Sequence, residues 1–504
     1  MSHQFLRLKS HYQADPLACY QHLSGGKPGS LLLESAEPSA GNAKQSLAVL
    51  DAALEIRALG QQIRVTSLSA NGAALLPALA GALGAEVNGD SFTVTVPRPD
   101  PELDEDQRLK APSVLSVVRE LLALLPQDPE LPFASLVAGL FGFDLIASFE
   151  ALPEVGGNEQ VPDLCLYLAE TLLHVDHQRQ SASLQALCLD GADSASYFEL
   201  SRRLARYHRQ LEQVPALEAI PAAGKPEATE VLPGDADFEA QVARLKEHIL
   251  AGDCFQVVPS RRFLAPCPEP LKAYRALRAQ NPSPYMFYLA HKDFTLFGAS
   301  PESALTVDSQ SRQLSLYPIA GTRPRGMDAD ADARIELELR LDEKEQAEHL
   351  MLVDLARNDV ARVAEPGSRA LAELLKVDRY ARVMHLVSRV TGTLRSDLDA
   401  LHAYQAAMNM GTLTGAPKVR ASELIRQVEG RRRGAYGGAI GYLTARGDMD
   451  SAIVIRSAQV VDGTACVQAG AGVVYDSVPR LEAEETRHKA SAVLAAIAAT
   501  QEAR

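Results

Sequence analysis

The sequence predicts an α+β protein built from antiparallel-type strands and separate helices, and three observations support this prediction. Hydrophobic residues make up 46% and charged residues 23% of the 504 residues, as in an ordinary globular protein with a large core. Strand-like and helix-like segments alternate without a regular strand–helix–strand repeat, which favours α+β over α/β. One segment rich in proline and glycine interrupts these patterns, so we expect two domains.

The interruption lies at residues 213–236, which contain four prolines, two glycines and little apolar periodicity. Such a composition is typical of a linker. The sequence therefore predicts a smaller α+β N-terminal domain at 1–212, a linker at 213–236 and a C-terminal domain at 237–504.

The N-terminal half has few informative segments. Alternating apolar residues predict strands over 30–35 and 91–96, and a helical apolar face predicts a helix over 113–125. No nucleophile, metal-ligand or phosphate-loop motif occurs in this half, so its sequence pattern indicates no catalytic function.

The C-terminal half has stronger patterns. The expected helices cover 237–251, 341–360 and 478–499, and the expected strands cover 254–259, 285–289, 294–299, 313–318, 434–443, 451–461 and 464–469.

Charge and composition exclude several classes of partner. The net charge is −14, and the longest basic run is Arg431–Arg433, which we interpret as a solvated turn beside glycines. A nucleic-acid binder would show a basic face, so we expect no nucleic-acid partner. The sequence has no signal-peptide pattern and no run of 18 apolar residues, so we expect no membrane partner. The six cysteines are scattered, which is typical of a reduced, cytoplasmic protein.

Two predicted helices each carry a pair of glutamates three residues apart. Glu345 and Glu348 share one face of the first helix, and Glu482 and Glu485 share one face of the second. Each pair alone is more typical of a charged first turn that complements the helix dipole. Together, the two pairs suit one Mg²⁺ ion that takes a carboxylate from each helix.

A glycine-rich segment, Gly470-Ala471-Gly472, follows the last predicted strand. Glycine there lets backbone N–H groups approach an anion, although a simple bulge fits the pattern equally well. The segment is not a dinucleotide-binding loop, because no helix follows it directly. Residues 409–418 lack the ending of a nucleotide-binding loop, so we reject that function as well.

Several short motifs occur in the order found in the chorismate-utilising enzymes, and over about 236–498 the sequence resembles that family. The motifs are Cys254–Val258, Ala299–Glu302, Pro318–Gly326, the Glu345/Glu348 helix, Gly415–Lys418, Tyr436–Gly438, Ile455–Arg456, Ala469–Gly472 and Glu485–Arg487. The resemblance implies an antiparallel-rich, two-layer catalytic domain around a central cleft.

The resemblance also implies roles for individual residues. Glu348 and Glu485 would bind Mg²⁺, with Glu345 and Glu482 beside them, and the metal would hold the ring carboxylate of chorismate. Glu302 would be the general acid that protonates the departing ring hydroxyl. The other implied catalytic positions are His385, Gln256 and Thr412. The implied substrate-binding positions are Gly321, Thr322, Tyr436, Arg456, Gly470, Ala471, Gly472 and Lys489.

Three positions narrow the implied reaction within the family. Members that add water to the ring carry a lysine where this chain has Gln256, and members that attack the ring covalently carry a lysine where it has Ala320. His385 matches a histidine linked to pyruvate elimination. The resemblance therefore implies addition of ammonia to chorismate and elimination of pyruvate, giving anthranilate. Two alternatives stay open: an enzyme that stops at aminodeoxychorismate, and an inactive tryptophan-binding sensor.

The resemblance further implies a regulator and a partner. Segments near 31–36 and 281–286 are similar to two walls of a tryptophan feedback site, at which the implied residues are Glu34, Ser35, Lys44, Pro284, Tyr285, Met286 and Tyr442. The chain has no cysteine–histidine motif of a glutamine amidotransferase. We therefore expect ammonia to come from a separate glutamine amidotransferase subunit.

Overall fold

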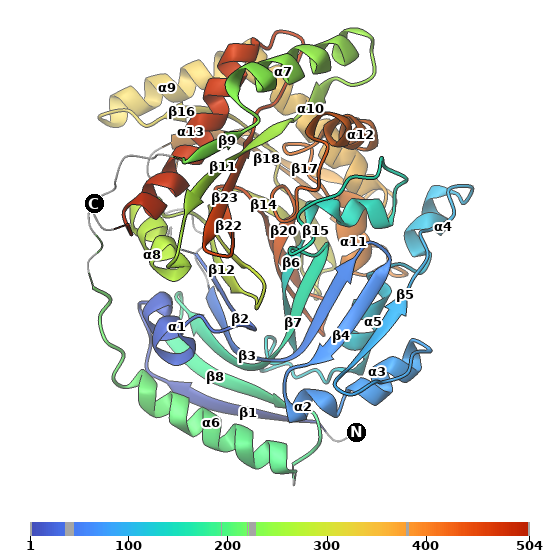
Figure 1. The fold of residues 1–504 in the computed structure, drawn as a ribbon, viewed down its shortest axis with the longest axis vertical. Coiled ribbons are helices and arrows are strands. Elements are labelled where there is room, and N and C mark those ends of the chain that lie inside the picture. The colour runs from blue at the N-terminus through green and yellow to red at the C-terminus, as the bar shows by residue number, and fades with distance from the viewer. Residues whose placement is uncertain are drawn as a thin grey trace.

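The computed structural model describes residues 3–35, 45–192, 194–218, 220, 228–379 and 383–501. Every pairing between the named strands in these ranges is antiparallel, and helices are interspersed among them (Figure 1). This arrangement confirms the predicted α+β class. No helix in these ranges is both long and apolar enough to cross a membrane.

The N-terminal half is a set of strands with short helices against them. The strands are β1 (Gln4–Ser10), β2 (Ser30–Glu34), β3 (Gln45–Leu59), β4 (Gln62–Ser67), β5 (Ser91–Thr95), β6 (Leu136–Phe141), β7 (Leu164–Asp176) and β8 (Ser181–Cys188). The helices are α1 (Pro16–Ser24), α2 (Ala70–Ala73), α3 (Leu76–Ala82), α4 (Glu105–Lys110), α5 (Ser116–Leu124), the 3-10 helix η2 (Phe143–Ser148) and α6 (Ala195–Leu211).

The C-terminal half has longer helices and more strands. Its strands are β9 (Glu230–Leu232), β10 (Gln256–Val257), β11 (Ser260–Pro266), β12 (Tyr285–Ala290), β13 (Thr295–Ser300), β14 (Ser303–Val307), β15 (Gln313–Leu316), β16 (Ile319–Pro324), β17 (Ala370–Arg379), β18 (Val383–Thr393), β19 (Gly415–Ala416), β20 (Ala439–Thr444), β21 (Met449–Ile453), β22 (Ser457–Val461) and β23 (Thr464–Gly470). Its helices are α7 (Asp235–Leu250), α8 (Pro270–Gln280), α9 (Ala329–Leu341), α10 (Glu343–Ala361), α11 (Ala400–Ala407), α12 (Lys418–Glu429) and α13 (Pro479–Ala498).

Strands from the two halves pair with each other. Strand β2 pairs with β12, and β6 pairs with β20, so both halves contribute to one continuous sheet. In Figure 1 the helices α7, α9, α10 and α13 lie at the end of the molecule opposite α6 and β1. Strand β9, which lies inside the predicted linker, pairs with β11. The domain boundaries at 212 and 237 stay a prediction.

The strands where the halves meet are buried on both faces. Successive side chains of a strand point to opposite faces. Leu31 therefore packs into a core between opposed strands, and Leu32 packs toward helices α1 and α8. On the paired strand β12, Phe287 packs in the same core as Leu31, and Met286 packs in the same core as Leu32. Burial of both faces explains why the sequence of such a strand is a continuous apolar run.

Three predicted strands differ from the structure. The segment 254–259 contains only the two-residue strand β10. The segment 451–461 is two strands, β21 and β22, which are separated at Arg456, whose φ is 48°. The segment 434–443 begins as a turn, with positive φ at Gly434 and Gly437, and becomes a strand only at Ala439. The chain turns at Arg456 because β21 pairs with β14 and β20, whereas β22 pairs with β13 and β23.

Candidate active site

Helices α10 and α13 bring the predicted glutamate pairs together. Burial raises the pKa of Glu348, and the negative charges of Glu345, Glu482 and Glu485 raise it further, against the opposing effect of Lys344. Burial also raises the pKa of Glu482, and the charge of Glu485 adds to this effect. The four carboxylates that the sequence singled out on two separate helices therefore face one another.

Nearby cations neutralise two of these carboxylates. Lys489 Nζ lies 2.6 Å from Glu485 Oε1, and Arg323 Nη1 lies 2.8 Å from Glu345 Oε1. In the described part of the chain, the ion-pair partner of Glu348 is Lys344, whose Nζ lies 4.0 Å from Glu348 Oε1. The group thus carries excess negative charge on oxygen ligands, which is the donor chemistry that Mg²⁺ prefers.

The carboxylates are not drawn tightly together. Within the described ranges, the one group of three or more metal-ligand atoms lying within 4.8 Å of one another is Glu55, Cys165 and His291, which lies elsewhere. Repulsion between the glutamates accounts for their wider spacing. The residues fit a Mg²⁺ ion by charge and ligand type.

Glu302 lies in the turn between β13 and β14 and is 8% exposed. Its Oε1 accepts a hydrogen bond of 3.0 Å from the hydroxyl of Thr412. Burial raises the pKa of Glu302 to about 7, although Thr412, Arg456 and Lys489 each favour the charged form. A carboxyl group with this pKa can hold a proton near neutral pH and release it in a reaction.

Arg456 lies where the other predicted residues meet. Its charge acts on Glu302, His385 and Tyr436, and the charge of Glu485 acts on it in turn. Burial lowers the pKa of Arg456 from its usual value. Its φ of 48° is uncommon for a residue with a side chain and is found where the surrounding structure enforces it. The break between β21 and β22 thus presents a guanidinium to the site.

The glycine-rich segment after β23 lies against two other predicted residues. The backbone N–H of Gly470 hydrogen-bonds the hydroxyl oxygen of Tyr436. A Cβ at Gly470 would lie 3.0 Å from that oxygen, and a Cβ at Gly472 would lie 3.1 Å from Nε2 of Gln256. Both glycines therefore allow a close approach of the backbone, and Lys489 Nζ donates to the Gly470 carbonyl at 3.1 Å.

His385 on β18 faces the bulge of β16. The strand register shifts between Ala320 and Thr322, and Gly321 in this bulge has a φ of 69°. The hydroxyl of Thr322 lies 2.9 Å from Nδ1 of His385. Burial lowers the pKa of His385 to about 4, and the charge of Arg456 lowers it as well. The imidazole is therefore neutral near pH 7 and can accept a proton.

The sequence analysis missed the buried arginines that support this site, and its interpretation of Arg431–Arg433 as a solvated turn was wrong. Arg433 is 3% exposed, and its guanidinium lies 4.5 Å from the ring centroid of Phe143 and 5.6 Å from that of Tyr436. It donates to the carbonyls of Leu413 and Val258 at 2.9 and 2.7 Å. Arg433 is buried because it finds partners from distant parts of the chain, and Arg431 and Arg432 are half-buried.

Two carboxylates of the N-terminal half form ion pairs with arginines of the C-terminal half. Asp144 pairs with Arg426 at 2.8 Å and accepts a hydrogen bond from the backbone of Gly434, and Asp163 pairs with Arg432. No spacing rule relates these residues, because hundreds of positions separate each pair. Complementary charge alone would not have identified the partners.

A second predicted cluster lines a cavity of about 610 Å³ between the halves. Its walls include Glu34, Ser35, Pro284, Tyr285, Met286 and Tyr442. Glu34 and Met286 are opposite each other in the β2–β12 pair, so the pairing of the halves creates the cavity. The hydroxyl oxygen of Ser35 is buried and has no hydrogen-bond partner in the described part of the chain. Lys44, the remaining predicted residue, lies outside the described residues.

Comparisons with known proteins show the family of the chain. The model of the chorismate binding enzymes matches residues 87–495. Anthranilate synthase component 1 of Salmonella typhimurium and that of Serratia marcescens are 52% and 53% identical to the chain; each alignment covers 99% of the chain and 98% of the relative.

Solved structures give the same result for the fold. Anthranilate synthase component I of Streptococcus pneumoniae superposes with a TM-score of 0.70 at 31% identity, covering 90% of this chain and 92% of that one. The isochorismate synthase MenF of Escherichia coli gives a TM-score of 0.70 at 17% identity, covering 98% and 95%, which shows a shared fold.

The chain therefore belongs to the family of chorismate binding enzymes. Within that family it is an enzyme of the anthranilate synthase type, a lyase. The matched range starts at residue 87, well before the 236 at which we placed the start of the resemblance. The matched range includes strand β6 of the N-terminal half, which pairs with β20 of the C-terminal half.

Proposed function

We propose that the chain catalyses the Mg²⁺-dependent reaction of chorismate with ammonia to give anthranilate, pyruvate and water. The observation that carries this proposal is the meeting of the α10 and α13 carboxylates next to Arg456, on which the charge of Glu485 acts, and next to Glu302, whose pKa burial raises to about 7. The site thus offers oxygen ligands, a cation for a carboxylate and a proton donor to one small polycarboxylate.

The substrate would bind through groups that match its two carboxylates. Arg456 can hold one carboxylate, with the hydroxyl of Tyr436 and the backbone of Gly470–Gly472 beside it. Glu348 and Glu485, with Glu482 close by, would hold a Mg²⁺ ion. When bound, this ion supplies positive charge that orients and screens the second carboxylate.

Glu302 would act in the first chemical step. Its carboxyl group donates a proton to the departing ring hydroxyl, which leaves as water while ammonia adds to the ring. His385 would act in the second step, in which the ring loses a hydrogen and pyruvate departs. Its neutral imidazole, oriented by Thr322, can accept that proton.

Three side chains support anthranilate as the product. Gln256 offers a neutral amide and no lysine that could activate water, and Ala320 offers no amine that could attack the ring. His385 is available for the elimination. The alternative is aminodeoxychorismate, which would form if the reaction stopped before His385 acted.

The source of ammonia would be a separate glutamine amidotransferase subunit. The relatives named anthranilate synthase component 1 imply a second component, and the sequence contains no glutaminase motif. The isolated chain should still use free ammonia.

The cavity between the halves would bind tryptophan as a feedback inhibitor. Its volume of about 610 Å³ suits a small aromatic ligand, and the buried Ser35 hydroxyl offers an acceptor for an amino group. Glu34 contributes to the wall, with its carboxylate held by Tyr274 and Arg278. Both halves form its walls, so tryptophan could favour one packing of the halves over another, provided it binds that packing more tightly.

The deciding experiment incubates the purified chain with chorismate, Mg²⁺ and an ammonium salt. We expect anthranilate fluorescence and an equal amount of pyruvate, both lost when a chelator removes Mg²⁺. A product that retains the enolpyruvyl group would favour the aminodeoxychorismate alternative. Absence of any chorismate consumption would refute the catalytic proposal and leave the tryptophan-binding sensor as the alternative.

A further inference from the structure

A buried ion pair beneath Glu302 has no part in the chemistry proposed above. Lys418 Nζ, at the start of α12, lies 2.6 Å from Oδ2 of Asp359 near the end of α10. The two side chains are 13% and 9% exposed. Taking two charges out of water is costly, so a pair at this position needs a structural or functional reason.

Lys418 also closes the end of another helix. Its ammonium donates to the carbonyls of Ala407 at 2.9 Å and Met408 at 3.5 Å. Ala407 ends α11, where the last carbonyls have no partner within the helix. The three donors of one ammonium group therefore join the ends of α10 and α11 to the start of α12.

The segment between these ends, residues 408–417, carries Thr412. The Thr414 hydroxyl donates to the carbonyls of Asn409 and Met410 at 3.0 Å, which folds the segment on itself. Strand β19 at its far end pairs with β10. Lys418 fixes the end that this pairing does not hold.

Helix α10 contacts the same segment a second time. A Cβ at Gly411 would lie only 2.2 Å from Cδ2 of Leu355, so Gly411 packs directly on that side chain. Leu355 and Asp359 are four residues apart and share one face of α10. Glu302, Thr412 and Asp359 line one small cavity of about 30 Å³, so the ion pair adjoins the acid and its hydrogen-bond donor.

We propose that Lys418, paired with Asp359, is a positioning residue that holds Thr412 against Glu302. Its charge is not one of those that act on Glu302, which are Arg456 and Lys489. Lys418 therefore acts on the acid through the position of Thr412. This inference rests on the role proposed for Glu302.

The proposal predicts a direction of change. The Thr412 hydroxyl stabilises the charged form of Glu302. If the segment shifts and this hydrogen bond is lost, the carboxyl holds its proton to higher pH. The basic limb of the pH–rate profile should then move up by about one pH unit, because a hydrogen bond to a charged group is worth about that much.

The experiment measures kcat/KM for chorismate against pH, at a constant concentration of free ammonia. We expect Lys418→Met and Thr412→Val to move the basic limb upward by similar amounts and to lower kcat. The combined variant should move it no further than Thr412→Val alone, because both changes remove one contact. Lys418→Met leaves Asp359 unpaired, so Lys418→Met with Asp359→Leu supplies a second, apolar replacement that should fold.

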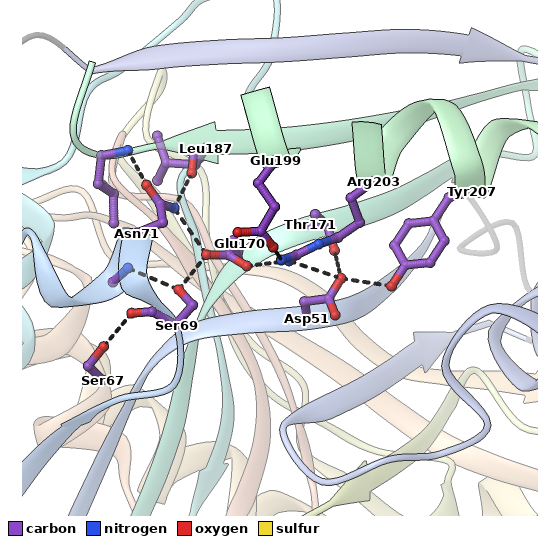
Figure 2. Close-up of polar contacts among 12 residues, drawn as sticks. Asp51, Ser67, Ser69, Asn71, Glu170, Thr171, Leu187, Glu199, Arg203 and Tyr207 are labelled. Atoms are coloured by element: carbon purple, nitrogen blue, oxygen red, sulfur yellow. Dashed lines mark hydrogen bonds and ion pairs between the residues drawn. The ribbon is translucent and has the colours of Figure 1, made fainter. Parts of the chain in front are cut away.

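A matched control removes a buried arginine far from the site. Figure 2 shows Arg203 of α6 between Glu170 and Asp51, where Nη1 of Arg203 lies 3.6 Å from Oδ2 of Asp51. Arg203→Met should lower the melting temperature and leave the basic limb where it is. An unmoved limb in both Lys418 variants would refute the proposal, as would shifts that add in the combined variant.

A second readout separates this inference from the proposed function. The C=O stretch of protonated Glu302 in infrared titration, identified by its loss in Glu302→Gln, follows the same proton without turnover. If the unaltered chain makes no anthranilate but this titration still moves in Lys418→Met, only the proposed reaction fails. If the chain is active and the titration does not move, only the positioning role fails.

Discussion

The catalytic cluster and the cavity between the halves are built in opposite ways. Several catalytic groups come from irregular backbone, namely the bulge at Gly321, the break at Arg456 and the turn at Glu302. The cavity lies instead against regular paired strands, β2 and β12. Chemistry requires side chains aimed at one point, which irregular backbone allows, whereas a binding wall can use the ordinary face of a sheet. Variants in one region should therefore leave the other unaffected.

The largest difference between the effect on catalysis and the effect on the cavity should come from His385→Ala. Pyruvate formation should fall by about 10²–10⁴-fold because the neutral imidazole that accepts the ring proton is gone. Amination does not need this group, so an aminated intermediate that keeps the enolpyruvyl group should accumulate, as chromatography with mass detection would show. His248→Ala, in the last turn of α7, is the control. Anthranilate formation at the normal rate by His385→Ala would contradict the assigned role.

A smaller loss should follow from Glu348→Gln. This change removes a charged ligand from the group on α10 and α13, so half-saturation with Mg²⁺ should need about a hundredfold more metal. Mg²⁺ titration of the anthranilate signal measures this, with Glu343→Gln on an exposed position of the same helix as the control. Tryptophan binding should not change. Equal Mg²⁺ dependence in both variants would contradict the assignment of Glu348 as a metal ligand.

Titration of Glu302 should change kcat/KM for chorismate about tenfold per pH unit. Its pKa of about 7 means that the protonated, proton-donating form dominates below pH 7. At constant free ammonia, kcat/KM should therefore fall about tenfold for each unit above the pKa, measured from initial rates. Tryptophan affinity, measured over the same range, should show no matching limb. A flat catalytic profile through pH 7–9 would exclude Glu302 as the acid.

The smallest effect should come from Ser35→Ala, which changes the cavity alone. Loss of one hydrogen bond to the ligand should weaken tryptophan binding by about 1 kcal/mol, or roughly fivefold, with unchanged kcat for chorismate. The chain contains no tryptophan, so the fluorescence of the added amino acid reports binding directly. Ser283→Ala on a nearby strand end, which is not part of the cavity wall, is the control. Unchanged affinity would remove Ser35 from the site.

The sequence predicted the two glutamate-bearing helices well, because helical periodicity is local. Helices α10 and α13 begin and end within two residues of the predicted ranges. The meeting of their carboxylates was inferred from the chemistry of two glutamate pairs and from the resemblance, since nothing in the spacing relates residue 348 to residue 485.

The break at Arg456 was missed for a different reason. The residues from Ser451 to Val461 have a continuous strand-like composition, so the sequence predicts one strand. The turn arises because β21 pairs with β14 and β20, whereas β22 pairs with β13 and β23. Tertiary pairing overrides local preference here. Arg433 was missed in the same way, because its carbonyl partners Leu413 and Val258 become neighbours only in the fold.

The pairing of β2 with β12 and of β6 with β20 also covers strand edges that could otherwise pair with other copies of the chain. A catalytic half made alone would carry β12 and β20 with open edges, and an unpaired strand edge recruits strands from other molecules. The half that holds none of the predicted catalytic residues thus covers edges through which the other half would otherwise aggregate. Its contribution to activity begins with keeping the catalytic half in solution.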